Sequence, residues 1–462
     1  MRYQLKEQIA LRSWWLVPYA YYRRGTRNAF GLKKEEFELL CRCDGRQELE
    51  ESALLSALAE RGLCAPCQGA GGLTPWQRPL ACENRYFPAM NWMITGKCNY
   101  NCLHCFNAAD NAPLMDEWSL AEAERLLDQA RDCGINAFTI TGGEPMLHRQ
   151  FFEIMQGICE RGMYVEELNT NGFFLDQQAL DRLRSMGCLP LIKLSFDGLG
   201  HHDWLRNRQG AEADALRAIR LCRENGFQVM VQTNVHKRNL ESMLPTIKRM
   251  EALGVNRMRI IRTTEAPRWV CNGGAYTLTL REYFDAMVAL LARCKEELEY
   301  MELDIWQLLT FFPAQRSYRL RPVLCEAGTY RDTIPVCRGN RGMVAVAANG
   351  NVFPCHQMSG YYEQHSDSLG NVKREGLQKL LQSGRYLDEV CTTVGVLKAR
   401  NQTCAACPYF PYCTGGCRAV ALALTGDKLG CDPSKCLFFR ERYEKKIAEA
   451  LRDYHNDTPI HT

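Results

Sequence analysis

The 462-residue chain lacks any long hydrophobic run. Its opening text, MRYQLKEQIALRSWW, is interrupted by charged side chains before an apolar segment forms, so we expect no secretory signal peptide. No stretch of about 18 uninterrupted apolar residues follows, which argues against a membrane-spanning helix. These absences predict a cytoplasmic protein with no membrane partner.

The chain also lacks an excess of charge of either sign. It carries 57 basic and 53 acidic residues, and a formal net charge of +4 is too even a balance to predict binding to nucleic acid. Hydrophobic residues make up 46% and charged residues 24%, which excludes a disordered or fibrous chain. The length fits roughly three domains.

Cysteine, in contrast, is abundant, with 24 residues in the chain. Such a density is typical of small secreted domains held by disulfides, but the missing signal peptide argues against that class. Cysteines that cluster are therefore expected to bind metal. Those inside helical patterns are expected to be small buried hydrophobic residues.

Three regions follow one another along the chain. Residues 1–82 hold strand-like text, SWWLVPYAYYRR, and then two stretches with helical periodicity, LKKEEFELLCRC and LEESALLSALAERGL. They predict a small α+β unit, which the Gly- and Pro-rich segment CQGAGGLTPWQRP links to the rest.

Residues 88–315 alternate short apolar runs with helical patterns, which predicts repeated parallel βαβ units. The expected strands are AMNWMIT, AFTIT, YVEELNT, LIKLSF, VMVQTNV and RMRIIRT. The expected fold is α/β, either a partial (β/α)6 TIM-like barrel or an open doubly wound sheet. In both, the chemistry belongs at the carboxyl ends of the strands.

From residue 320 the periodicity weakens and cysteines crowd together. Such text predicts a loop-rich module over 320–440 that is held together by metal, followed by a C-terminal helix and tail over 441–462.

The first cysteine motif follows directly on the first expected strand. In NWMITGKCNYNCLHCFNA, Cys98, Cys102 and Cys105 have the spacing C-x3-C-x2-C. Three thiolates on one loop can hold three irons of a [4Fe–4S] cluster and leave the fourth iron open to another ligand. The alternative is a zinc site completed by His104 or by a distant residue.

The second motif, TITGGEP, ends the second expected strand. Gly142 and Gly143 allow backbone to approach a ligand closely, and Glu144 can accept a hydrogen bond from an ammonium group. By itself, a Gly-Gly turn before a helix is an ordinary turn.

In this order, the two motifs resemble those of the radical S-adenosylmethionine (SAM) superfamily. The resemblance covers residues 90–265. It implies that Cys98, Cys102 and Cys105 bind the cluster, that SAM occupies the open iron, and that Gly142, Gly143 and Glu144 contact SAM. One electron from the cluster would then split SAM into methionine and a 5′-deoxyadenosyl radical, which abstracts hydrogen from the substrate.

Weaker matches follow in the same region. KLSFDG resembles the family's fourth-strand segment, which implies that Ser195 and Asp197 face SAM, and HDWLRNRQG then offers Arg206 for the SAM carboxylate. Asn171, in NTNG, ends the third expected strand at the same level. Each of these residues also suits a strand-end cap or turn.

The later cysteines resemble the SPASM extension of peptide-modifying radical SAM enzymes. All seven positions of its pattern are filled, by Cys337, Cys355, Cys404, Cys407, Cys413, Cys417 and Cys436. The resemblance implies two auxiliary [4Fe–4S] clusters, one held by Cys404, Cys407, Cys413 and Cys436 and the other by Cys337, Cys355 and Cys417.

Three questions about this module stay open in the sequence. Cys325 is expected to close the second auxiliary cluster, whose fourth iron would otherwise be free to bind a substrate thiolate. Cys431 competes with Cys436 for the last position, and the helix that follows favours Cys436. A pair of zinc ribbons is the alternative to both clusters.

The N-terminal text FGLKKEEFELLCRCDGRQ and ALLSALAERGL resembles the small winged-helix domain that recognises leader peptides in pathways of ribosomally made, modified peptides. In that family the leader adds as a strand to a sheet edge. The alternative is a unit that only packs against the barrel.

Together the resemblances imply a radical SAM maturase that abstracts hydrogen from a precursor peptide and installs a cross-link, a thioether first or a carbon–carbon bond. The implied cofactors are three [4Fe–4S] clusters and SAM. The implied partners are a peptide with a leader segment and an external flavodoxin- or ferredoxin-like reductant.

Two alternatives remain, namely formylglycine-type oxidation of a protein Cys or Ser, and a non-catalytic zinc or electron-transfer protein. The sequence identifies neither the peptide residue attacked nor the bond formed. It also leaves open the catalytic acid or base and the oligomeric state.

Overall fold

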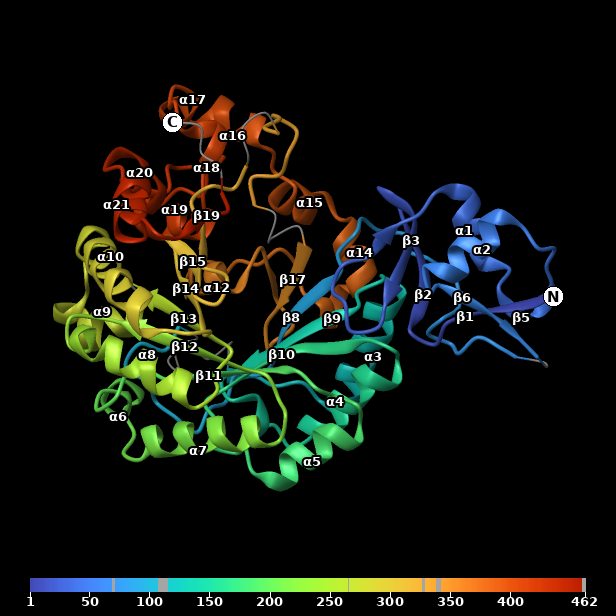
Figure 1. Ribbon diagram of the computed structural model, residues 1–462, viewed down its shortest axis with the longest axis horizontal. Coiled ribbons are helices and arrows are strands. Elements are labelled where there is room, and N and C mark those ends of the chain that lie inside the picture. The colour runs from blue at the N-terminus through green and yellow to red at the C-terminus, as the bar shows by residue number, and fades with distance from the viewer. Residues whose placement is uncertain (69–70, 107–114, 265, 326–328, 338–341, 459–462) are drawn as a thin grey trace.

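The computed structural model describes residues 1–68, 71–106, 115–264, 266–325, 329–337 and 342–458 (Figure 1). Two residues of the predicted linker, 69 and 70, lie outside this set. No helix within the described residues combines the length and the apolar character needed to cross a bilayer.

A curved, mostly parallel sheet forms the centre of the molecule, with helices on its outer face (Figure 1). All six stretches predicted to be strands are strands. They are β8 (Ala89–Thr95), β9 (Ala137–Gly142), β10 (Tyr164–Thr170), β11 (Leu191–Ser195), β12 (Val229–Val235) and β13 (Arg257–Arg262). A seventh parallel strand that we did not predict, β14 (Glu302–Ile305), pairs with β13.

The helices that connect these strands lie where the periodicity places them. They are α3 (Leu120–Asp132), α4 (Phe151–Glu160), α5 (Gln177–Ser185), α7 (Ala211–Glu224) and α8 (Met243–Ala252). Strand residues that face them are fully buried, as Ile192 and Leu194 of β11 are, whereas Lys193 and Ser195 between and after them are only partly buried. Because alternate strand residues point to opposite faces, Lys193 and Ser195 point to the inner face.

The C-terminal region continues the same sheet at both edges. β15 (Leu309–Phe312), β16 (Ser317–Leu320) and β19 (His455–Asn456) extend it beyond β14. On the other edge β17 (Met343–Val346) pairs in parallel with β8 and carries β18 (Val352–Phe353). The sheet therefore runs across the boundary predicted near residues 315–320.

The expected loop-rich module contains many short helices. None of those described is longer than the nine residues of α12 (His356–Gln364). The others are α13 (Val372–Glu375), α14 (Leu377–Gln382), α15 (Gly384–Val390), α16 (Val394–Arg400), α17 (Gln402–Ala405), α18 (Phe410–Cys413), α19 (Arg418–Thr425), α20 (Pro433–Arg440) and α21 (Tyr443–Ala450). With four to nine residues each, these helices are too short to give a sustained periodic apolar pattern in the sequence.

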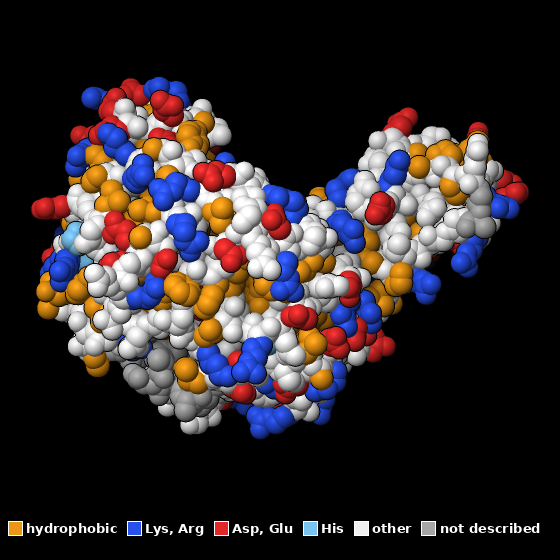
Figure 2. Space-filling view, turned by 90° about the horizontal axis from the view of Figure 1, so that it is seen from below, with side chains coloured by type: hydrophobic (Ala, Val, Ile, Leu, Met, Phe, Trp, Pro, Cys, Tyr) orange, Lys and Arg blue, Asp and Glu red, His pale blue; other side chains and the backbone are white. Residues whose placement is uncertain are grey.

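The N-terminal unit forms a separate lobe with its own small core (Figures 1 and 2). One sheet has the order β5-β1-β6 and the other β4-β3-β2-β7. The elements are β1 (Arg2–Leu5), β2 (Ile9–Trp14), β3 (Val17–Arg23), β4 (Phe30–Gly31), α1 (Lys34–Cys41), β5 (Asp44–Glu48), α2 (Ala53–Glu60), β6 (Cys64–Cys67) and β7 (Leu80–Ala81).

Two tryptophans dock this lobe on glycines of the barrel. The indole of Trp14 donates to the Cys133 carbonyl at 3.1 Å and packs so closely on Gly134 that an added Cβ would lie 2.6 Å from the ring. Trp76, in the predicted linker, packs on Gly162 in the same way, at 1.9 Å. The linker is therefore held against the barrel.

We expect Gly162→Ala to loosen this docking, with Gly187→Ala as the matched control. Both glycines have a positive φ, +75° and +68°, so alanine at either costs about 1–2 kcal/mol of left-handed strain. Only at Gly162 would the methyl group also displace an indole, which adds about 1–3 kcal/mol, since a Cβ at Gly187 meets nothing within 4 Å.

Urea unfolding and limited proteolysis between the lobe and the barrel measure this effect. The Gly162 variant should be cut faster than the Gly187 variant. Equal cleavage of the two would show that Trp76 does not hold the lobe.

Candidate functional site

The first cysteine motif occupies the loop that leaves the carboxyl end of β8. Cys102 is buried beside Tyr100, and its carbonyl accepts a hydrogen bond from the Cys105 N–H at 3.2 Å. The pKa of Cys98 is raised to about 12, because protein atoms desolvate its thiol and because Glu144, Cys102 and Cys105 lie near it. The structure thus brings the three predicted ligands together beside Glu144.

Gly142 and Gly143 allow the end of β9 to touch this loop. The Gly143 N–H donates to the Thr95 carbonyl and the Glu144 N–H to the Lys97 carbonyl, both at 2.8 Å. A Cβ on Gly142 would lie 2.4 Å from the Thr95 oxygen, and one on Gly143 would lie 2.2 Å from the Lys97 oxygen. Any side chain at these two positions would push the cysteine loop away.

Glu144 is fully buried among donors from the next strand. One carboxylate oxygen accepts from the Thr170 hydroxyl at 2.8 Å, and the other accepts from the Asn171 N–H at 2.8 Å. Burial raises the pKa of Glu144 to about 7, although these hydrogen bonds lower it. The Asn171 amide also donates to Asn99 at 2.8 Å, so β10 is tied to the cysteine loop as well.

The third cluster of predicted residues centres on Asp197, which has no exposed surface. Its carboxylate accepts from the Arg206 guanidinium at 2.7 Å and lies 3.1 Å from His202 Nδ1. Burial alone would raise the pKa of Asp197, but the ion pair with Arg206 and the contact with His202 hold it well below its usual range. Both partners lie on α6 (His202–Arg206).

Arg206 reaches from this pair to the cysteine loop. Its Nη1 lies 3.9 Å from the Cys102 sulfur, which places a permanent positive charge beside one predicted cluster ligand. Asp197 therefore orients the guanidinium of Arg206. The second contact of the Asp197 carboxylate, His202, was not predicted from the sequence.

His104, the zinc ligand of the alternative interpretation, is half-buried and lies beside Asn234. Its Nε2 is 3.1 Å from the Asn234 amide, and burial lowers its pKa to about 3. Asn234 comes from β12, and no local signal in the sequence pairs it with this loop.

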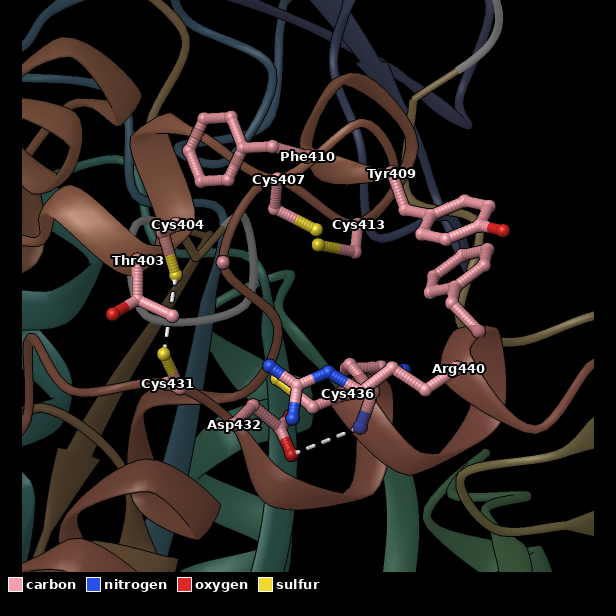
Figure 3. A pocket seen from close by; sticks show the side chains of 13 residues that line it. Thr403, Cys404, Cys407, Tyr409, Phe410, Cys413, Cys431, Asp432, Cys436 and Arg440 are labelled. Atoms are coloured by element: carbon pink, nitrogen blue, oxygen red, sulfur yellow. Dashed lines mark hydrogen bonds between the residues drawn. The ribbon is translucent and has the colours of Figure 1, made fainter.

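Five cysteines line a cavity in the C-terminal region (Figure 3). They are Cys404, Cys407, Cys413, Cys431 and Cys436. The sulfurs of Cys404 and Cys431 lie 3.6 Å apart, and those of Cys407 and Cys413 point toward one another. The structure therefore places both candidates for the last ligand, Cys431 and Cys436, at the same cavity.

The thiols of this cavity are costly to ionise without metal. Burial raises the pKa of Cys413 to about 11 and that of Cys436 to about 12. A bound iron cation would remove this penalty, because metals bind the thiolate. Among the described residues, no three His, Cys, Asp or Glu side chains converge on a site for a single metal ion.

A third group joins Cys337, Cys355 and Cys417. Burial and then the neighbouring Cys417 and Cys337 raise the pKa of Cys355, and Cys337 also acts on Cys417. Cys417 thus lies near Cys337 and Cys355, and their binding of one cluster stays a prediction. Cys325 is buried, with its sulfur 3.2 Å from the Thr329 hydroxyl, and its role as a ligand stays a prediction.

Comparison with known proteins finds both predicted domains. Residues 92–250 match the radical SAM superfamily, and residues 337–408 match the SPASM iron–sulfur cluster-binding domain. The chain is 26% identical over 355 residues to AdoMet-dependent heme synthase of Methanosarcina barkeri, which covers 74% of this chain and 94% of that protein. It is 25% identical over 347 residues to PqqA peptide cyclase of Granulibacter bethesdensis, covering 74% and 86%.

The fold resembles that of Streptococcus suis SuiB bound to precursor peptide SuiA. The TM-score is 0.64 at 13% identity, and the match covers 94% of this chain and 99% of SuiB. The matched domains imply bound [4Fe–4S] clusters and SAM, and the grouped thiols on the β8 loop and around the C-terminal cavity suit such clusters. The chain is therefore a radical SAM superfamily enzyme with a SPASM iron–sulfur domain.

Proposed function

We propose that this enzyme modifies a ribosomally made precursor peptide and installs a cross-link, a thioether or a carbon–carbon bond. The observation that carries the proposal is the extent of the fold similarity to a peptide-bound relative. It covers 94% of the chain, and residues 1–82 make up more than the remaining 6%, so the similarity extends into the N-terminal unit. The setting we propose is the reducing cytoplasm, where clustered thiols stay available to iron.

The residues of the first site then take distinct roles. Cys98, Cys102 and Cys105 hold the cluster, Gly142, Gly143 and Glu144 receive the ammonium group of SAM, and Arg206, oriented by Asp197, faces its carboxylate. Ser195 and Asn171 line the same space at neighbouring strand ends. When bound, the cluster and SAM supply a 5′-deoxyadenosyl radical that takes hydrogen from the substrate.

The C-terminal cysteines are proposed to hold two further [4Fe–4S] clusters, which makes three in all. Cys404, Cys407, Cys413 and Cys436 bind one, and Cys337, Cys355 and Cys417 bind the other, with Cys325 as its fourth ligand. When bound, these clusters would offer an acceptor for the electron left when the cross-link closes. A flavodoxin- or ferredoxin-like protein supplies the electron that starts the reaction.

A second candidate substrate is a porphyrin, because a heme synthase is among the similar proteins. That match covers 74% of this chain, as does the match to PqqA peptide cyclase, so neither match separates the two substrates. The similarity to peptide-bound SuiB covers 94% of the chain and extends into the N-terminal lobe, which favours the peptide. The lobe also disfavours formylglycine-type oxidation, whose enzymes generally lack such a unit.

The lobe, proposed to be of the winged-helix leader-binding type, has a short edge strand, β4, that is exposed. Phe30 and Gly31 are both exposed, and β4 ends its sheet among the described strands. The Leu32 N–H donates inward to the Tyr19 carbonyl at 2.9 Å. Because neighbouring strand residues point their N–H groups to opposite sides, that of Gly31 faces outward and can pair with an added leader strand.

Gly31→Pro removes this outward donor, and Gly31→Ala is the matched control that keeps it. A Cβ at Gly31 meets nothing within 4 Å, so alanine fits. The loss of one backbone hydrogen bond should weaken leader binding about fivefold or more in the proline variant only. Fluorescence anisotropy of a labelled leader peptide measures it, and equal affinity in both variants would refute docking on β4.

Iron analysis tests the cluster assignment. The reconstituted protein should hold about 12 irons per chain and release 5′-deoxyadenosine with SAM and dithionite. Replacing Cys98, Cys102 and Cys105 together by Ala should remove about four irons and all 5′-deoxyadenosine. The exposed Cys271, replaced by Ser, is the control and should change neither.

The same measurement separates the two candidates at the C-terminal cavity. Cys436→Ala should lose about four irons while Cys431→Ala retains them, because the assignment gives the last position to Cys436. The opposite result would assign the last ligand position to Cys431. Zinc in place of iron in the intact protein would contradict the enzyme assignment as a whole.

The raised pKa of Glu144 predicts pH-dependent SAM binding. Below pH 7 the carboxyl is protonated and cannot pair with the SAM ammonium group, so affinity should fall up to tenfold per pH unit as the pH drops below about 7. Above it the affinity should level off. Glu144→Gln should bind SAM weakly and independently of Glu144 ionisation, as equilibrium dialysis between about pH 6 and pH 8 would show.

A further inference from the structure

Charged side chains line the inner face of the barrel, where the proposed mechanism assigns no role. Lys193 lies on β11 and Arg259 on β13, each between strand residues that are fully buried in the outer core. Because alternate residues point to opposite faces, both cations point inward. The strand register pairs Arg259 with Asp304 on β14, which shares that face.

The ion pairs on this face leave one positive charge uncompensated. Asp304 accepts from Arg259 Nε at 2.7 Å and from Arg321 Nη2 at 2.6 Å, so a single carboxylate serves two guanidinium groups. Among the described carboxylates, Glu167 is the one paired with Lys193, at 3.7 Å from its Nζ, and Asp304 acts on Lys193 from further away. Three cations thus face two carboxylates.

Lys193 is the least satisfied member of this group. The separation of 3.7 Å from Glu167 is longer than a hydrogen bond, and the Lys193 side chain keeps only 14% of its surface exposed. Burial lowers the pKa of Lys193, Glu167 and Asp304 act against it, and Arg259 acts in the same direction as burial. A buried cation in this position is stabilised by a further anion.

The cationic face lies next to the space proposed for SAM. Lys193 is two residues before Ser195 on the same face of β11, a separation of about 6.6 Å along the strand. At the other side the Arg321 carbonyl accepts from Lys435 Nζ at 3.2 Å, and Lys435 lines the C-terminal cysteine cavity. A substrate held here would lie between the two cysteine sites.

We propose that Lys193, Arg259 and Arg321 bind a carboxylate of the substrate and so position its neighbouring C–H bond for the radical. This inference rests on the proposed function, in which the carboxylate belongs to an Asp or Glu side chain near the modified residue of the peptide. The propionate groups of a porphyrin offer the same chemistry, and the test separates the two sources.

Two opposite substitutions distinguish binding from simple structural support. Lys193→Gln should weaken binding of a carboxylate-bearing substrate about tenfold or more, because it removes the uncompensated charge. Glu167→Gln should preserve or strengthen it, because it frees Lys193 from the carboxylate that lies nearest to it among the described residues. Arg257→Gln is the matched control, since Arg257 lies on the same face of β13 but already pairs with Glu302 at 2.6 Å.

The probes are chosen so that charge is the only difference within each pair. The first pair is the leaderless core of the precursor peptide from a neighbouring reading frame, with its acidic residues intact or changed to Asn and Gln. The second pair is iron coproporphyrin III and its tetramethyl ester. Calorimetric titration with SAM present and no reductant measures binding without turnover, and iron content and unfolding in urea confirm that each variant is folded.

The inference is supported if the wild-type protein prefers the acidic peptide over the amide peptide. This preference should be lost in Lys193→Gln and kept in Glu167→Gln and Arg257→Gln. The same pattern with the porphyrin and no peptide binding would support the carboxylate site while overturning the peptide function. Equal binding of the acidic and amide peptides would overturn the site while leaving the peptide function in place. The site would also be overturned if Lys193→Gln and Glu167→Gln lost the same affinity for the acidic probe. The same holds if the wild-type protein preferred neither charged probe over its uncharged partner.

Discussion

The contact between the end of β9 and the cysteine loop is the constraint on which the rest of the first site depends. Two backbone hydrogen bonds, from Gly143 to Thr95 and from Glu144 to Lys97, hold the loop within reach of the neighbouring strands. These hydrogen bonds form only because neither Gly142 nor Gly143 carries a side chain. From this contact Glu144 extends to Thr170 and Asn171, and Asn171 returns to Asn99 in the loop, so three consecutive strands position one set of thiols.

What could be predicted from the sequence is what local patterns encode. The six strands and five helices of the barrel follow from periodicity, and the order of the cysteine motifs places them at strand ends. The strand β14 was missed because it is only four residues long and its Asp304 interrupts the apolar run. The pairing of Asn234 with His104, and of Asp304 with Arg259, depends on strand register, which no local pattern specifies.

The N-terminal lobe shows a different limit of sequence reasoning. Its two helices and the strand-like stretch over residues 13–24 were predicted from the sequence, but β1, β5, β6 and β7 were not, and the Gly- and Pro-rich text that follows was interpreted as a linker. In the structure Trp76 and Gln77 of that text are buried, and Trp76 packs on a glycine of the barrel. Composition indicates where a chain turns, yet it does not reveal that a large aromatic side chain within the turn meets a site shaped for it.

The distance between the first cysteine site and the C-terminal ones is set by the sheet and not by a linker. Cys355 follows β18, which pairs with β17, and β17 in turn pairs in parallel with β8, whose end carries the first cysteine loop. His356, the next residue, lies with its Nε2 3.1 Å from the Asn91 carbonyl of β8. Continuous backbone pairing of this kind resists domain motion, because separating the sites would break a strand ladder. We therefore expect charge on the inner face of the sheet, and not closure of one domain on another, to select the substrate that binds between them.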